Sequence, residues 1–212
     1  MMRAIPRVSR VPLRVTLFAL AAMLLTFCSG CATSPAASFY TLNPVRLAGP
    51  SADPTPSAAP LMIAIGPVTV PELVDRAQIV TRVDANRVSI DEFARWADPL
   101  TSQIPRVLAA DLQQLIPGAI VSTYPQRVDD NAYRVSIDVQ DFDAQVHGTV
   151  MLAAIWSVLP PRHGQPVSGR TVTQEALSGP GYDPLVKAYS RALASVAADI
   201  AVATRSARLI TR

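Results

Sequence analysis

The sequence of 212 residues is poor in the side chains that most enzymes use for chemistry. It has two cysteines, two histidines and a single lysine, Lys187. The histidines, His147 and His163, do not have the spacing of a metal-ligand pair. No G-x-S-x-G, H-E-x-x-H or glycine-rich phosphate loop occurs. These shortages predict a protein without catalytic activity, metal or cofactor, and they leave a hydrolase as a distant alternative.

Acidic residues do not form a convincing metal site either. Asp138, Asp141 and Asp143 lie close together, but they lack the glycine and the bidentate glutamate of a calcium-binding loop. We therefore expect them to be solvated carboxylates at the end of a strand.

The chain also lacks an apolar run long enough for a confident membrane span, which needs about 20 residues. Its longest candidate near the start, residues 15–27, follows a segment with four arginines and no acidic residue. This order is typical of a secretory signal. Ser29-Gly30-Cys31 then resembles the lipobox of bacterial lipoproteins, although Cys28 stands where that pattern prefers leucine.

The lipobox resemblance implies that residues 1–30 are a signal peptide, that Cys31 is acylated (palmitate included), and that 31–38 form a spacer before a domain at 39–212. Cys28 would leave with the signal, so that no C-x-x-C pair remains for redox or zinc chemistry. Ala32 after the cysteine favours the outer membrane over the inner one.

Removal of the signal also removes the excess of positive charge. The remaining part has 15 basic and 16 acidic residues, a formal net charge of −1. A nucleic-acid partner needs a clustered basic face, and no such cluster occurs in the sequence. We therefore expect no nucleic-acid partner.

Periodicity predicts a domain of several strands and two main helices. The expected strands are 39–42, 61–70 with a bend at Gly66-Pro67, a hairpin within 78–90 around Asp84-Ala85-Asn86, 133–139 with a bulge at Gln140-Asp141, 150–159, and 170–177. The strand at 150–159 is apolar at nearly every position, which is typical of a strand covered on both faces. Residues 43–60 read as a proline-rich loop.

The first expected helix has Asp98 as its N-cap and Pro99 at its first position, and it ends at Pro117-Gly118. Pro105 predicts either a kink or a later start. The second helix runs from Pro184, with Asp183 as its cap. Its narrow apolar stripe fits a coiled-coil seam or packing on a sheet, and the small alanines between its larger residues favour the sheet.

Several blocks, in order, resemble the PqiC/YmbA family of ABC-type transport auxiliary lipoproteins over the whole chain after the signal. The blocks are Cys31 with Phe39-Tyr40-Thr41-Leu42, IAIGPVTVPELVDRAQIVTR, RWADPL with Trp96, LAAIWSV, and the closing AYSRALASVAADIA. The resemblance implies an α/β fold in which two principal helices pack on a mixed sheet, as in the amino-terminal domain of TolB.

The same resemblance implies an outer-membrane lipoprotein that faces the periplasm and contributes to membrane integrity. Its partners would be the lipid bilayer, an MCE-domain protein and an inner-membrane component of an intermembrane lipid transport system. A homo-oligomer is left open. The alternative is a structural assembly lipoprotein of an outer-membrane complex that handles no lipid.

Phe39, Tyr40 and Trp96 are the candidate contact residues for a partner, because exposed aromatic side chains often anchor interfaces. The competing interpretation places Trp96 against the sheet beside the first helix and Phe39 and Tyr40 in the core. The sequence leaves both interpretations open.

Overall fold

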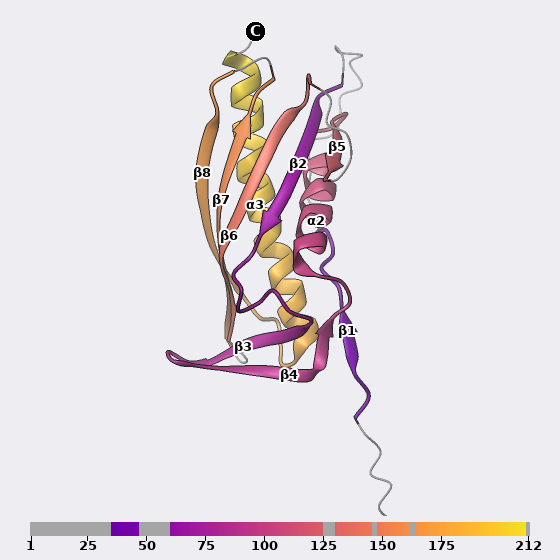
Figure 1. The fold of residues 1–212 in the computed structure, drawn as a ribbon, viewed down its shortest axis with the longest axis vertical. Helices are drawn as coiled ribbons and strands as arrows, with labels where there is room; N and C mark the ends of the chain where they lie inside the picture. Colours follow the sequence, from indigo (N-terminus) through magenta and orange to yellow (C-terminus); the bar gives the residue numbers. More distant parts are fainter. Residues whose placement is uncertain (1–34, 47–59, 125–129, 146–147, 162–163, 211–212) are drawn as a thin grey trace, which may run out of the picture. The chain divides into compact units, whose positions relative to one another are not determined.

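The computed structural model describes residues 35–46, 60–124, 130–145, 148–161 and 164–210. Cys31, both histidines and the predicted signal lie outside the described residues. Residues 37–212 belong to one compact unit, whose elements are labelled in Figure 1. The strands are β1 (Ser38–Tyr40), β2 (Met62–Thr69), β3 (Gln78–Asp84), β4 (Arg87–Trp96), β5 (Ile120–Thr123), β6 (Tyr133–Ala144), β7 (Thr149–Leu159) and β8 (Val167–Ala176), and the helices are α2 (Leu100–Leu115) and α3 (Tyr182–Ile210).

The larger sheet is mixed and has five strands in the order β5-β2-β6-β7-β8. β2 pairs in parallel with β5 and β6, whereas β6, β7 and β8 pair antiparallel. The register of β2 against β6 shifts between Ile65 and Val68, which confirms the predicted bend at Gly66-Pro67. A mixed sheet with two helices confirms the predicted α/β class.

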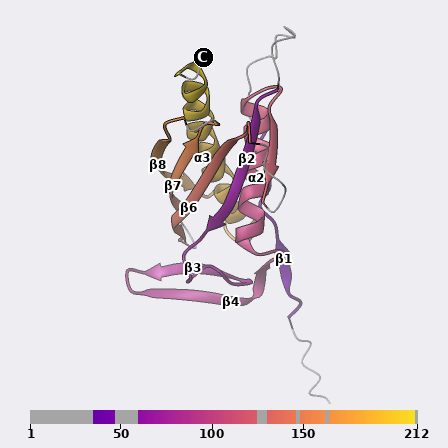
Figure 2. The same ribbon diagram turned by 45° about the horizontal axis from the view of Figure 1, so that its top comes forward.

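The smaller sheet has three strands in the order β1-β4-β3. Its β3–β4 hairpin runs across the end of the larger sheet (Figure 2). The hairpin turns at Ala85-Asn86, as predicted. β1 pairs in parallel with the last residues of β4, from Ala94 to Trp96. This pairing joins segments far apart in sequence, and local patterns did not predict it.

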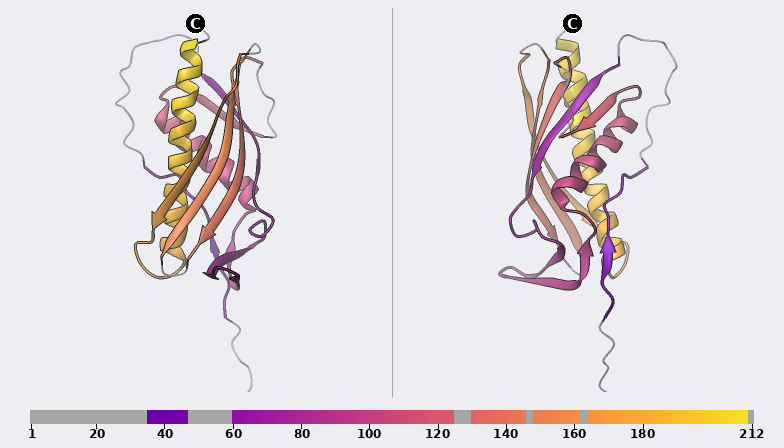
Figure 3. Two further views of the ribbon diagram at one scale, coloured as in Figure 1. Left: turned by 90° about the vertical axis from the view of Figure 1, so that its left-hand side faces the viewer. Right: turned by 45° about the vertical axis from the view of Figure 1, so that its right-hand side comes forward.

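Both helices cover the same face of the larger sheet (Figure 3). α3 packs on β7, β8 and α2, and α2 packs on β2 and β5. Ala188, Ala192 and Ala197 of α3 are fully buried, because small side chains allow close approach to the sheet. Sheet packing is thus confirmed for α3. The helix begins at Tyr182, so Asp183 lies in its first turn and the predicted cap was wrong.

The start of α2 also differs from the prediction. Pro99 is the N-cap residue and no side chain caps the helix. The Asp98 carboxylate instead pairs with Arg106 at 2.5 Å. Pro105 is accommodated inside the helix near its start. After Leu115 the chain turns through Gly118, whose φ of 80° suits glycine, which confirms the predicted end.

The prediction for β6 is confirmed, whereas the prediction for β7 is wrong. The register shift between Val139 and Asp141 confirms the bulge in β6. β7, however, was wrongly expected to be covered on both faces. Met151, Ile155 and Leu159 alternate with buried residues and are 37–40% exposed, because both helices lie on the opposite face. The short edge strand β5 was not predicted.

Candidate functional site

Two of the three acidic residues of β6, Asp138 and Asp143, have partners in the structure, and Asp143 is part of an ion pair and not a freely solvated carboxylate as predicted. The Thr69 hydroxyl donates to Asp138. Arg82 donates from Nε and Nη2 to Asp143 over 2.8–3.1 Å, and this pair ties β3 to β6. Among the described residues, no group of His, Cys, Asp or Glu side chains could hold a metal ion.

The segment that follows β1, residues 41–46, lies against both helices, and we call it the strap. The Leu42 N–H donates to Oε1 of Gln103 at 2.7 Å. The Asn43 N–H donates to the Ser190 hydroxyl at 3.3 Å, and the Gln114 side chain donates to the Val45 carbonyl at 3.0 Å. Helix side chains thus satisfy the backbone of a segment that belongs to neither sheet.

One of the groups that hold the strap is a fully buried carboxylate. Asp111 of α2 has no exposed surface, and its Oδ2 has no hydrogen-bond partner among the residues described. Burial raises the pKa of Asp111 from 3.8 to about 6, although the Val45 N–H favours the charged form. The strap is therefore held partly by a group that titrates near neutral pH.

Trp96 lies at the junction of the two sheets and not on the surface. It is 4% exposed and meets Phe142 and Tyr189 edge-on at ring distances of 6.2 Å. Those two rings stack at 3.8 Å, and the Tyr189 hydroxyl donates to the Phe142 carbonyl at 3.1 Å. This position agrees with the packing interpretation of Trp96. Tyr40 is partly buried beside Tyr182, at 5.6 Å between rings.

Phe39 is different, because it is 64% exposed. It is the register partner of Arg95, so both side chains point to the same side of the three-stranded sheet. Phe93, two residues before Arg95, is 47% exposed, while Ala94 and Trp96 between and after them are buried. We call Phe39, Phe93 and Arg95 the aromatic face.

Arg95 has incomplete hydrogen bonding within this face. Its Nη2 lies 3.6 Å from the Glu92 carboxylate, and its side chain is 36% exposed. Its Nε is buried and has no hydrogen-bond partner within the described part of the chain. The guanidinium therefore keeps capacity for a further acceptor.

The backbone that carries Phe93 is fixed by Asp91. The Asp91 carboxylate accepts the N–H groups of Phe93 at 2.8 Å and Ala94 at 3.2 Å, and it accepts the Tyr182 hydroxyl at 2.8 Å. These bonds, that of Phe93 foremost, lower the pKa of Asp91 against a smaller opposing effect of burial. Asp91 thus stays ionised and links the irregular part of β4 to the start of α3.

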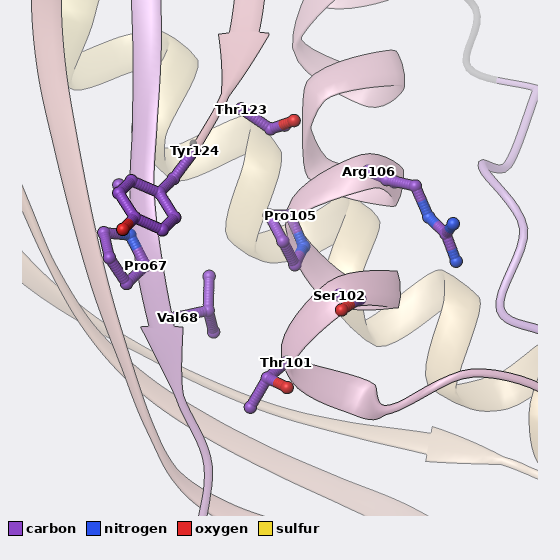
Figure 4. A pocket seen from close by; sticks show the side chains of 9 residues that line it. Pro67, Val68, Thr101, Ser102, Pro105, Arg106, Thr123 and Tyr124 are labelled. Carbon is purple, nitrogen blue, oxygen red and sulfur yellow. The ribbon is translucent and has the colours of Figure 1, made fainter. Parts of the chain in front are cut away.

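A groove of about 460 Å³ lies where β2 bends. Figure 4 shows Pro67 and Tyr124 on one side of it and Thr101, Ser102 and Pro105 of α2 on the other. β5 stops here, with the Tyr124 N–H bonded to the Ile65 carbonyl at 2.9 Å. Because Pro67 has no N–H, the edge of β2 lacks a donor just beyond this point. A second groove, of about 620 Å³, shares Gly66, Pro67 and Tyr124 and extends over β6 to Leu159.

Comparison with known proteins decides the family. Residues 40–201 match the model of the ABC-type transport auxiliary lipoprotein component. The chain belongs to this family. Two relatives, from Escherichia coli K12 and Shigella flexneri, are each named intermembrane transport lipoprotein PqiC. Each is 26% identical over 173 residues, which cover 82% of this chain and 89% of the relative.

Two solved structures share the fold of this transport auxiliary lipoprotein. One, described as an uncharacterised protein, has a TM-score of 0.66 and 22% identity, and the match covers 79% of this chain and 97% of that one. The other, from Xanthomonas campestris, has a TM-score of 0.62 and 19% identity, with 78% and 93% covered. None of the helices in the described ranges is long and apolar enough to cross a membrane.

The family match covers the strap and most of the aromatic face, whereas Phe39 lies just before it. Sequence reasoning singled out Phe39, Tyr40 and Trp96, and a role for any of them in partner contact stays a prediction. It missed Phe93 and Arg95. The alternation in Phe93-Ala94-Arg95-Trp96 was a signal that could have revealed their exposed side.

Proposed function

We propose that this protein is a non-enzymatic, lipid-anchored component of an intermembrane lipid transport system, held at the outer membrane and facing the periplasm. The observation that carries the proposal is the match of residues 40–201 to a family of transport auxiliary lipoproteins. Its relatives bear the name intermembrane transport lipoprotein. The family is one of transport components and not of enzymes.

The proposed anchor is Cys31, with acyl chains on that residue. Seven residues, 32–38, lie between it and Phe39. An extended chain spans at most about 3.3–3.6 Å per residue, so this spacer reaches no farther than about 25 Å. A domain held so closely cannot bridge two membranes by itself.

The bridging partner in this proposal is an MCE-domain protein, which works with an inner-membrane transport component. The domain described here would receive the end of that partner near the outer membrane. Since the strap ties the segment after β1 to both helices, the domain offers a rigid receiving surface and not a flexible tether.

Co-purification tests this function. The lipidated protein is isolated from detergent-solubilised envelopes, and bound proteins and phospholipids are identified by mass spectrometry, with Cys31→Ser as the control. Recovery of an MCE-domain protein together with phospholipid supports the proposal. Recovery of outer-membrane proteins without phospholipid favours a structural assembly role, and recovery of neither contradicts both.

A further inference from the structure

We propose that the aromatic face rests on the phospholipid leaflet that holds the lipid anchor. Phe39, Phe93 and Arg95 would make a second, non-covalent contact between the domain and the membrane, in addition to the lipid anchor. The proposal rests on the proposed acylation of Cys31.

The first argument is the length of the chain before the fold. Phe39 lies eight residues after Cys31, so a fully extended chain places it at most about 29 Å from the anchored residue. Any shorter path brings it nearer to the leaflet. Among the exposed aromatic side chains of the described residues, Phe39 is therefore the one tied most closely to the membrane.

The second argument is the chemistry of the face. Phe39 is the register partner of Arg95, and Phe93, also exposed, lies two residues before Arg95 in β4. Aromatic rings favour the boundary between headgroups and acyl chains. An arginine can lay its apolar stem along that boundary while its charged head stays among the phosphates. The weak pairing of Arg95 with Glu92, at 3.6 Å, leaves the guanidinium able to bind a phosphate oxygen.

The third argument is that Phe93 is held outward. Three hydrogen bonds to the Asp91 carboxylate fix the backbone on both sides of the ring and connect it to α3. The side chain therefore cannot readily turn into the core, where Ala94 and Trp96 already occupy the buried positions. A phenyl ring held in the exposed position stays available for contact with the boundary between headgroups and acyl chains.

The test uses the full lipidated chain in vesicles of phosphatidylethanolamine and phosphatidylglycerol. Once the signal is removed, the acylated Cys31 is the sole cysteine, so single cysteines can be labelled with a polarity-sensitive fluorophore. Labels at Phe39→Cys and Phe93→Cys report on the face. Labels at Val172→Cys and Val202→Cys are matched controls, since both residues are 55% exposed.

We expect blue-shifted emission and several-fold quenching by phospholipids brominated near the headgroup for the labels at 39 and 93, and water-like emission for both controls. Water-like emission at 39 and 93 in a protein that floats with the vesicles overturns this proposal alone. Failure to float overturns the anchor and this proposal together. Water-like labels that become protected only when an envelope protein extract is added assign the face to a protein partner instead.

A second variant excludes an effect of the label itself. A label at Gln78→Cys, opposite Arg95 on β3, should also show blue-shifted emission in the parent. When Phe39→Ser and Phe93→Ser are added together, the emission of this label should shift back toward its value in water. The pair Val172→Ser and Val202→Ser should leave it unchanged. Circular dichroism of both double variants should match the parent, and an unchanged label in the first of them contradicts the proposal.

Discussion

Replacement of Asp111 by asparagine should stabilise the domain at neutral pH. The carboxylate is fully buried, and burial raises its pKa from 3.8 to about 6. A tenfold change in proton affinity between the unfolded and folded protein corresponds to about 1.4 kcal/mol, so ionised Asp111 destabilises the fold by up to about 3 kcal/mol above pH 6. An uncharged amide of the same shape avoids this penalty.

The sign of the pH dependence follows from proton binding. Between pH 3.8 and 6 the folded protein holds the Asp111 proton more tightly than the unfolded chain does. The free energy of unfolding therefore falls as the pH rises through this window. Above pH 6 the free energy of unfolding does not fall further because of Asp111. Below pH 3.8 the carboxyl is protonated in both states and the penalty is absent. In Asp111→Asn this component of the pH profile should vanish.

Urea unfolding at several pH values measures the effect, with the fluorescence of the buried Trp96 and Trp156 as the signal. For a slope of about 2 kcal/mol per molar urea, the midpoint of Asp111→Asn at pH 7.5 should rise by up to about 1.5 M, and at pH 4 it should match the parent. Asp130→Asn, at a fully exposed side chain, is the control. Parallel profiles for Asp111→Asn and the parent would refute the assignment of the raised pKa to buried Asp111.

Three further predictions concern the core and the anchor. Gly169→Ala places a Cβ against the Trp156 ring and should lower the free energy of unfolding by about 1–3 kcal/mol, whereas Ser168→Ala beside it should have little effect. Cys31→Ser should abolish metabolic labelling with palmitate, while labelling that persists would contradict the lipobox; Cys28→Ala should retain it. A long Gly/Ser insertion after Ala37 should leave fold and lipidation intact but weaken transport function, and full function would show that the anchor is a simple tether.

Local pattern was enough to predict most elements of this fold. The bend in β2 followed from Gly66-Pro67, the bulge in β6 from the phase shift before Phe142, and the packing of α3 from its alanines. The errors came from distant partners. The apolar run of β7 reads as a strand covered on both faces, but nothing in it records that α2 and α3 lie on the same side.

The candidate site was harder to predict, because its residues meet through pairing between strands. Nothing local distinguishes Phe39 from Trp96 in the sequence, since both are aromatic residues that could pack in the core or contact a partner. Only the parallel register of β1 with β4 places Trp96 in the core and Phe39 opposite Arg95. The burial of Asp111 could not be predicted for a related reason. The strap that lies beside it, residues 41–46, is far from it in sequence.

The two sheets are joined firmly enough that orienting one orients the other. Arg82 pairs with Asp143 across them, Trp96 packs against Phe142 and Tyr189, and Tyr182 bonds Asp91. If the aromatic face rests on the leaflet, the direction of the five-stranded sheet relative to the membrane is fixed as well. The exposed outer face of that sheet, with Met151 and Ile155, would then meet an approaching partner in one defined orientation. If both proposals hold, the short spacer keeps the domain in that orientation, and a longer spacer would release it.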